Sequence, residues 1–355
     1  MNPPKEYRKP GVVWKLNKVV YGLTDASRNW YLRVYEAFDS LGMWKCELDN
    51  AVFCYGSKEL KGVAIIHVDD VLYFGGQDFH KSVMSKFRES FKISKEEKEA
   101  FKYVGISLSQ VSDGIAFSQG GYLNTLPLKI IDKSHLKDNL RYATEEERKK
   151  FRRSVGQLGW LANTSRPEGS FSYCLLSTVQ SNPQVKDFKL LEKTIKDLNS
   201  TDGHIKIRKM SLKELRLAVF CDASYANLTG GSSQIGYIIF LHDASLKSVP
   251  VSWTSKKAAR VARSTLTAET LAAVEAVDAA YAVKRFVEPV FMCKLPPIDV
   301  YVDNKSLYDS VQTTNSLAEK RLMVDMAALR EMVERKEIYM HWVPTEKQLA
   351  DVLTK

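Results

Sequence analysis

The sequence predicts an α+β protein whose C-terminal part, residues 213–355, is a mixed five-stranded sheet flanked by helices. Short apolar runs with strand character recur between residues 215 and 343. An alanine-rich segment at 265–287, free of Gly and Pro, follows the third run and predicts a long helix. Strands and helices then alternate to the end of the chain. That order is typical of a mixed sheet covered by helices.

The elements of this C-terminal part are joined by short turns. Polar turn formers cluster at 199–203 (NSTDG) and mark a boundary before the first strand. Gly230-Gly231 and the region of Asp243 supply turns between the first three strands, and Pro289 is expected to stop the long helix. The predicted elements are strands at 215–221, 234–241 and 248–253, a helix at 265–287, a strand at 298–302, a helix at 321–336, a strand at 338–343 and a last helix beginning at 346.

The first part of the chain has a different order of elements. Residues 28–41 have the apolar periodicity of an amphipathic helix, and Ser112-Asp113-Gly114 is a turn signal between two strand-like runs. Trp160, Phe171 and Tyr173 are expected in the core, because large aromatic residues at helical spacing are usually buried. The predicted elements are a helix at 28–41, strands at 51–55, 62–68 and 71–74, a helix at 78–100, strands at 104–109 and 115–118, and helices from 122 to 200.

Length and charge limit the kinds of function. A chain of 355 residues is too long for one ordinary core, so two or three domains are expected. No apolar run reaches the roughly 18 residues of a membrane span. Residues 1–212 carry 34 Lys and Arg against 25 Asp and Glu, whereas residues 213–355 carry 18 against 17. This basic first part suggests contact with the phosphates of a polyanion. The densest basic cluster, for which a solvated helix face is the alternative, is Arg148, Lys149, Lys150, Arg152 and Arg153.

Four carboxylates stand at the beginnings or ends of predicted elements, where side chains can gather at one edge of a sheet. Hydrolysis of a phosphodiester by two metal ions needs several carboxylates converging on ions about 4 Å apart. Mg²⁺, or Mn²⁺ in its place, prefers the oxygen ligands that Asp and Glu supply. The predicted catalytic and metal-binding residues are Asp222 at the end of the first strand, Glu269 in the first turns of the long helix, Asp303 at the end of the fourth strand and Asp351 on the last helix.

Each of these carboxylates alone has an ordinary alternative role as a cap, a turn residue or a solvated surface residue. Their order and local contexts make the combination specific: FCDAS, TAET, YVDNK and QLAD. With these motifs the chain resembles the ribonuclease H domain of copia-type long-terminal-repeat retrotransposon Pol polyproteins. Further motifs resemble the reverse transcriptase of the same elements, in the same order: VVYGLTDASRNWY at 19–31, HVDD at 67–70, YVGISLSQ at 103–110 and SVGQLGWLANTSRP at 154–167.

The resemblance implies three domains. Residues 1–120 would be a partial reverse-transcriptase palm, 121–212 a thumb and connection region, and 213–355 a ribonuclease H-like domain. Asp69 and Asp70 match the adjacent pair of catalytic and metal-binding carboxylates in the palm. The third palm carboxylate precedes the YGL motif in the family, and no Asp occurs among the first 20 residues. We therefore expect polymerase activity to be lost, or to need residues of the fingers that this chain lacks. His67 stands where the family usually has Tyr.

The resemblance also implies the partners: an RNA–DNA hybrid or a template–primer duplex, the rest of a Pol polyprotein, and no membrane. The location that the resemblance implies for the protein is a cytoplasmic retroelement particle, or the nucleus. Local capping is the alternative role for Ser224 and Asn304, which could otherwise contact the ribose 2′-OH or a phosphate. Ser264 is expected to cap the long helix, and His341 to be structural. The predicted nucleic-acid contacts are Ser224, Asn304, Lys256, Lys257, Arg260, Arg148, Lys149, Arg152 and Arg153.

Two readings of the whole chain stay open at this point. The first is a ribonuclease specific for RNA–DNA hybrids, joined to a polymerase remnant. The second is a catalytically silent nucleic-acid-binding fragment, decayed or domesticated. A transposase or integrase is disfavoured, because the Glu of those enzymes lies on a late helix, whereas Glu269 comes second among the four carboxylates. Because the sequence ends inside QLADVLTK, the last predicted helix is expected to be truncated, with Asp351 on its frayed end.

Overall fold

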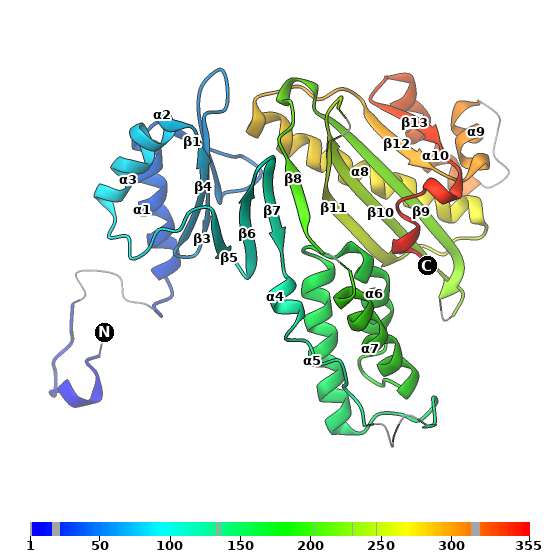
Figure 1. Cartoon of the computed structure of the whole chain (residues 1–355), viewed down its shortest axis with the longest axis horizontal. Coiled ribbons are helices and arrows are strands. Elements are labelled where there is room, and N and C mark those ends of the chain that lie inside the picture. The colour runs from blue at the N-terminus through cyan, green and yellow to red at the C-terminus, as the bar shows by residue number, and fades with distance from the viewer. Residues whose placement is uncertain are drawn as a thin grey trace. The chain divides into compact units, whose positions relative to one another are not determined.

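The computed structural model (Figure 1) describes residues 2–15, 22–132, 135, 137–201, 203–228, 230–245, 247–313 and 320–355. Two compact units divide the chain: Met1–Glu96 with Val290–Met292, and Glu97–Pro289 with Cys293–Lys355. The predicted boundaries at residues 120 and 212 both fall inside the second unit and stay predictions. Across the described parts of the chain, no helix combines the length and the apolar character needed to cross a membrane.

The first unit is an antiparallel four-stranded sheet packed against a helix. The predicted helix is present as α1 (Ala26–Ser40), and its buried Val34 and Phe38 join a core with Phe53, Phe79 and Phe87. The strands, in the spatial order β1-β2-β3-β4, are β1 (Met43–Lys45), β2 (Val52–Tyr55), β3 (Gly62–His67) and β4 (Asp70–Gly75).

The helix predicted at 78–100 is shorter in the structure. It comprises α2 (Gln77–Phe79), a π-helical turn at His80–Met84 and α3 (Ser85–Ser90). Phe91 has an extended backbone, and the next eight residues form no helix. Residues 92–99 (KISKEEKE) contain a single apolar side chain, so a helix there would have no apolar face to bury.

The second unit contains a small antiparallel sheet and a group of helices. The sheet has the order β5-β6-β7-β8. The predicted strand pair is present as β6 and β7, whereas β5 and β8 were not predicted. These strands are β5 (Ala100–Tyr103), β6 (Ile106–Val111), β7 (Gly114–Ser118) and β8 (Ile205–Arg208). The helices are α4 (Gly120–Leu123), α5 (Glu145–Ala162), α6 (Ser170–Thr178) and α7 (Val185–Asn199).

Helix α5 begins at a capping box formed by Thr144 and Glu147. Its inner face, with Phe151 and Leu158, packs against α7 in the core of this helical group. Trp160 lies on the other face with 41% of its surface exposed, so the prediction that it belongs to the core is wrong. Trp160 lies two positions after Leu158, and a step of two in an α-helix turns a side chain by about 200°. Phe171 and Tyr173 are partly buried.

The large sheet has the spatial order β11-β10-β9-β12-β13, which confirms the predicted five-stranded mixed sheet. Its first three strands are antiparallel, and the last two run parallel to β9. Helix α8 lies behind the sheet in Figure 1, and the C-terminal segment lies in front of it. The strands are β9 (Arg216–Leu228), β10 (Ser232–His242), β11 (Ser248–Lys257), β12 (Ile298–Val302) and β13 (Ile338–Trp342).

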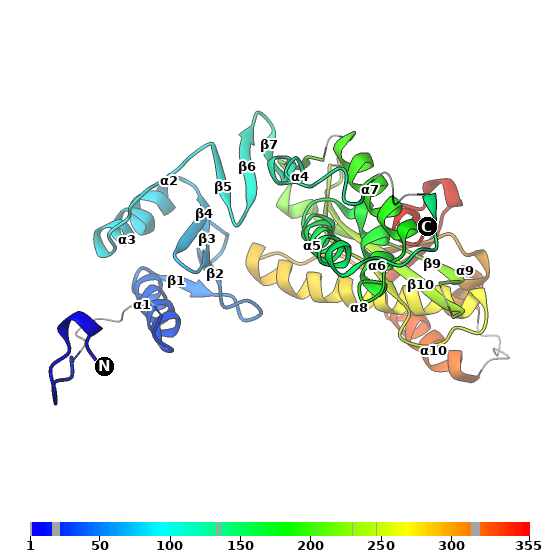
Figure 2. The same cartoon turned by 90° about the horizontal axis from the view of Figure 1, so that it is seen from below.

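The helices of this part are α8 (Thr265–Phe291), α9 (Lys305–Gln312) and α10 (Lys320–Glu334). Helix α8, seen along its length in Figure 2, continues through Pro289, which was predicted to stop it. The last helix predicted from residue 346 is absent. Two short 3₁₀ turns, Thr345–Lys347 and Asp351–Leu353, take its place. Between them Gln348 has an extended backbone, and its side-chain amide donates a hydrogen bond of 2.9 Å to the backbone oxygen of Cys221.

Candidate active site

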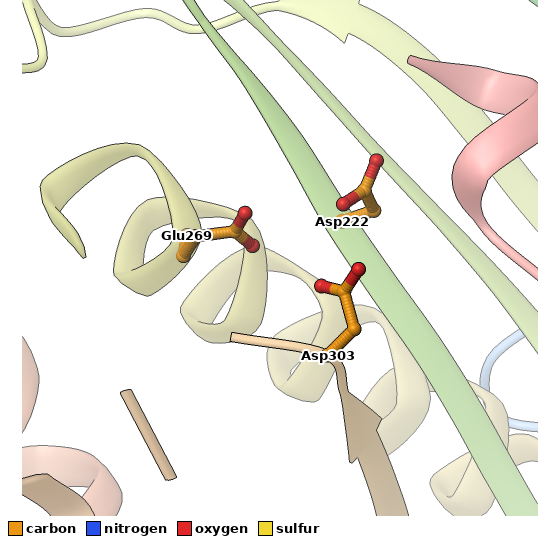
Figure 3. Close-up of side chains that lie close together, drawn as sticks. All are labelled: Asp222, Glu269 and Asp303. Atoms are coloured by element: carbon orange, nitrogen blue, oxygen red, sulfur yellow. The ribbon is translucent and has the colours of Figure 1, made fainter. Parts of the chain in front are cut away.

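Three of the four predicted carboxylates meet at one point beside the large sheet (Figure 3). Asp222, Glu269 and Asp303 each offer an oxygen atom, and these oxygens all lie within 4.8 Å of one another. Asp222 was predicted to end its strand. It lies instead inside β9, which continues to Leu228. The register explains its meeting with Asp303: Phe220 of β9 is paired with Tyr301 of β12, and each carboxylate follows two residues later.

Glu269 reaches this point from the first turns of α8. The Ser264 hydroxyl accepts a hydrogen bond of 3.1 Å from the backbone N–H of Thr267, as expected for the residue that caps the helix. The backbone N–H of Ala223 donates to the Glu269 carboxylate. The start of α8 is thereby tied to β9 one residue beyond Asp222.

The cluster concentrates negative charge where little water reaches it. Asp222 is 2% exposed and Glu269 is 5% exposed. Burial, with the nearby charges of Asp222 and Asp303, raises the pKa of Glu269 to about 9. Burial is also the main reason that the pKa of Asp222 lies above its ordinary value. Burial and like charges nearby disfavour the ionised form of a carboxyl group. A cation bound among the three carboxylates would offset this repulsion.

Several polar groups that the sequence analysis missed contact the cluster. The Thr345 hydroxyl donates a hydrogen bond of 2.9 Å to Oδ2 of Asp303. The indole N–H of Trp342 donates to the backbone oxygen of the same residue, also at 2.9 Å. The Thr354 hydroxyl donates to Oδ2 of Asp222. Hydroxyl and indole groups carry no distinctive spacing, so only the fold shows that they lie here.

Asp351 does not belong to the group of three. Its Oδ1 pairs with the ammonium group of Lys355, and its side chain is 35% exposed. The hydrogen bond to Asp351, together with the negative charges of Asp222, Asp351 and Asp303, raises the pKa of Lys355. Lys355 therefore supplies positive charge beside the cluster. The metal-binding role of Asp351 stays a prediction.

Asp69 and Asp70 lie at an exposed hairpin turn between β3 and β4. Val68 precedes them with a φ of 53°, a conformation that β-branched residues rarely adopt. The indole N–H of Trp30 donates a hydrogen bond of 2.6 Å to the Val68 oxygen and holds the turn. Within the described residues, neither Asp joins a group of three potential ligands. The first three residues of the VVYGLTDASRNWY motif, 19–21, lie outside the described residues.

The predicted nucleic-acid contacts are held in different ways. Lys256 pairs with Glu275, and Arg260 pairs with Asp325 at 2.8 Å. Asn304 caps α9 by accepting a hydrogen bond of 2.9 Å from Leu307, which is the capping role considered as its alternative. Their binding roles stay predictions, as do those of Ser224 and Lys257.

The basic cluster lies on α5 and divides into two kinds of residue. Arg148 and Arg152 donate hydrogen bonds to the backbone oxygens of Ser181 and Gln180 at 3.3 and 3.1 Å. Part of the hydrogen-bonding capacity of each guanidinium is therefore taken up inside the protein. Lys149 and Arg153 are exposed. His341, expected to be structural, lies 2.8 Å from buried Asp299.

Comparison with known proteins agrees with this fold. Residues 2–147 match the family described as reverse transcriptase (RNA-dependent DNA polymerase). The chain is 26% identical, over 98% of its length, to the retrovirus-related Pol polyprotein from transposon RE1 of Arabidopsis thaliana. It is 25% identical, over 100% of its length, to that from transposon TNT 1-94 of Nicotiana tabacum. The matches cover 24% and 28% of those polyproteins, so the chain spans about a quarter of their length.

Among solved structures, the chain is similar to the foamy viral protease-reverse transcriptase in complex with RNA/DNA hybrid. The TM-score is 0.51 with 13% identity, over 94% of this chain and 40% of that chain. At that identity the likeness concerns the fold. Residues 2–147 thus match the model of the reverse transcriptase family, and the chain as a whole is similar to the Pol polyproteins of copia-type retrotransposons.

Proposed function

We propose that the second unit is a ribonuclease H that uses Mg²⁺, or Mn²⁺, to cleave the RNA strand of an RNA–DNA hybrid. The observation that carries this proposal is the convergence of three carboxylates, from β9, α8 and the end of β12, within 4.8 Å of one another. Their order along the chain, Asp, Glu and Asp, is that of the family motifs.

The residues present fit a hard divalent cation. All three offer carboxylate oxygen, and neither His nor thiolate belongs to the group. The raised pKa of Glu269 reflects repulsion that a cation would relieve. Asp222, Glu269 and Asp303 would hold the metal. When bound, it would supply an activated water and neutralise charge on the scissile phosphate.

The protein's own groups would orient these ligands and the hybrid. Thr345 restrains the carboxylate of Asp303, and the Ala223 N–H restrains that of Glu269. Lys355, which interacts with the charges of Asp222 and Asp303, would add a positive charge beside the metal ligands. Selection of the RNA strand requires recognition of a ribose 2′-OH, and Ser224, two residues from Asp222 along β9, is our candidate donor.

The exposed face of α5 is suited to hold a duplex backbone. Lys149, Arg153, Gly156 and Trp160 are exposed and recur at intervals of four, three and four residues, which places them in one stripe. Gly156 has no atom within 4 Å of the position that a Cβ would take, so a backbone could approach the helix closely there. Two cations and one aromatic ring match the chemistry of phosphates and sugars or bases. The foamy viral relative in fold was solved with an RNA/DNA hybrid, which supports this choice of ligand.

The proposal is tested by incubating the purified full chain with an end-labelled RNA–DNA hybrid. We expect cleavage of the RNA strand with Mg²⁺ or Mn²⁺, none in EDTA, and a loss of at least about 100-fold in Asp222→Asn. Glu331→Gln, on the exposed side of α10, is the matched control and should cleave as the wild type does. Absence of metal-dependent cleavage in the wild type would contradict the proposal. Salt-dependent hybrid binding without cleavage would favour the silent binding fragment.

A further inference from the structure

The C-terminal segment ends with a threonine buried against the carboxylate cluster. Thr354 is 0% exposed. Its hydroxyl lies within hydrogen-bond distance of Oδ2 of Asp222 and 3.2 Å from the backbone oxygen of Asp351. A hydroxyl has one proton, and a carboxylate is the stronger acceptor, so the proton is directed to Asp222.

The backbone on both sides of Thr354 is held by side chains of the sheet. The Ser255 hydroxyl donates a hydrogen bond of 2.6 Å to the Leu353 oxygen, and it accepts one of 2.8 Å from the amide of Gln234. The amide of Asn227 donates to the Thr354 oxygen at 3.3 Å. Gln234 is fully buried, so this arrangement is an internal part of the fold.

Close approach of the segment to the sheet depends on a glycine. Gly236 of β10 is paired with Asp222 of β9. A Cβ at Gly236 would lie 2.6 Å from Cβ of Leu353 and 3.1 Å from Cγ2 of Thr354. The first separation is too short for carbon atoms, and Cβ of Leu353 cannot move without its backbone. Leu353 is itself anchored in an apolar cluster with Ile238 and Ala350.

We propose that Thr354 is a positioning residue for Asp222, and that Gly236 is the position on the sheet that allows it to reach. The hydrogen bond restrains rotation of the Asp222 carboxylate about its Cβ–Cγ bond. Figure 3 shows one oxygen of Asp222 directed toward the other two carboxylates. Partners that orient a metal ligand commonly change metal affinity by 10–100-fold when removed. This inference rests on the proposed metal site.

The test is calorimetric titration of Mn²⁺ into the full chain. Thr354→Val removes the hydroxyl and keeps the shape, and we expect it to bind Mn²⁺ about 10-fold more weakly. Thr354→Ser restores a hydroxyl and should return the affinity to within about threefold of the wild type. A purely structural role for the threonine methyl group would give the opposite order, with the serine variant the weaker binder.

A second variant keeps the inference open to contradiction if Thr354→Val does not fold. Gly236→Ala should weaken Mn²⁺ binding to a similar degree. Its matched control is Gly121→Ala, an exposed glycine of α4 with no atom within 4 Å of the Cβ position, which should bind as the wild type does. If either variant folds and binds Mn²⁺ as tightly as the wild type, the positioning role of Thr354 is overturned while the proposed function stands. A wild-type chain that binds no Mn²⁺ would instead overturn the proposed function.

Discussion

The indole N–H of Trp253 donates a hydrogen bond of 2.7 Å to the backbone oxygen of Ala162. Trp253 belongs to β11 of the large sheet, and Ala162 is the last residue of α5. A weaker contact of 3.8 Å joins Cys174 of α6 to the buried Gln234 of β10. The helices after the small sheet are therefore attached to the sheet that carries Asp222, within one compact unit.

Loss of this attachment should lower stability. We expect Trp253→Phe to reduce the free energy of unfolding by about 1–3 kcal/mol, because packing is reduced and the Ala162 oxygen loses the shorter of its two side-chain hydrogen bonds, keeping that from the Ser170 hydroxyl at 3.1 Å. Urea denaturation of the full chain measures the change. Tyr339→Phe, at an exposed position of β13, is the control and should change stability by less than about 0.5 kcal/mol. Equal stability of the two variants would show that the contact contributes nothing.

Glu269→Gln should abolish cleavage and stabilise the protein in EDTA. The pKa of Glu269 is raised to about 9 from 4.5, so its contribution to stability is fully present below pH 4.5 and is lost as the pH rises toward 9. Gln has no such dependence. The difference in Tm between variant and wild type should therefore increase from pH 5 to pH 9, as measured by thermal unfolding. A Tm difference that stays constant or decreases over this pH range would contradict the raised pKa of Glu269.

Asp351→Asn should impair cleavage less than Asp222→Asn. Asp222 is buried in the group of three, whereas Asp351 lies outside it and pairs with Lys355. We expect a loss of at least about 100-fold for Asp222→Asn and a loss at least about tenfold smaller for Asp351→Asn. Initial rates on one hybrid, at saturating Mg²⁺, measure both. Equal losses would place Asp351 among the essential ligands.

Glu147 should give the protein an acid-sensitive contribution to stability. The Arg141 guanidinium is the main reason that its pKa is lowered to about 2 from 4.5. The contribution is therefore present above pH 4.5 and is lost as the pH falls toward 2. Glu147→Gln should destabilise by about 3 kcal/mol at pH 7 and by much less at pH 3, as measured by urea unfolding. The exposed neighbour Glu146→Gln is the control, and an equal effect there would contradict the role of burial.

The stripe on α5 should bind nucleic acid through phosphates. Replacing both Lys149 and Arg153 by Gln should weaken hybrid binding and reduce the slope of log K against log salt by about 2. Fluorescence anisotropy at several salt concentrations measures the slope. The control pair is Lys193→Gln with Lys196→Gln on the exposed face of α7. An unchanged slope in the stripe variant would exclude this helix from the interface.

The sequence predicted the carboxylate cluster well where local order determined it. Glu269 begins a helix and Asp303 follows a strand, and both features can be recognised from nearby residues. Asp222 was predicted to lie at the end of a strand, because the residues that continue β9 after it include polar ones and lack the apolar pattern of a strand. Ser224 is partly buried and residues 225–227 are exposed, so apolar periodicity gives no signal there.

The supporting contacts could not be predicted, because they depend on tertiary packing. The segment after Pro344 has helical composition, yet Gln348 bonds to the Cys221 oxygen and its backbone is extended. The misassigned helix concealed the place of Thr354 beside Asp222. Strand β8 was missed because it has only four residues, and its pairing with β7 spans the intervening helices.

The central claim is that Asp222, Glu269 and Asp303 together hold a divalent metal. Anomalous diffraction from crystals of the full chain grown with Mn²⁺ tests it most directly. We expect a peak within coordinating distance of oxygens from all three residues, and its loss in crystals of Asp222→Asn. A chain that cleaves hybrid in Mn²⁺ while its crystals show Mn²⁺ only elsewhere would contradict the assignment.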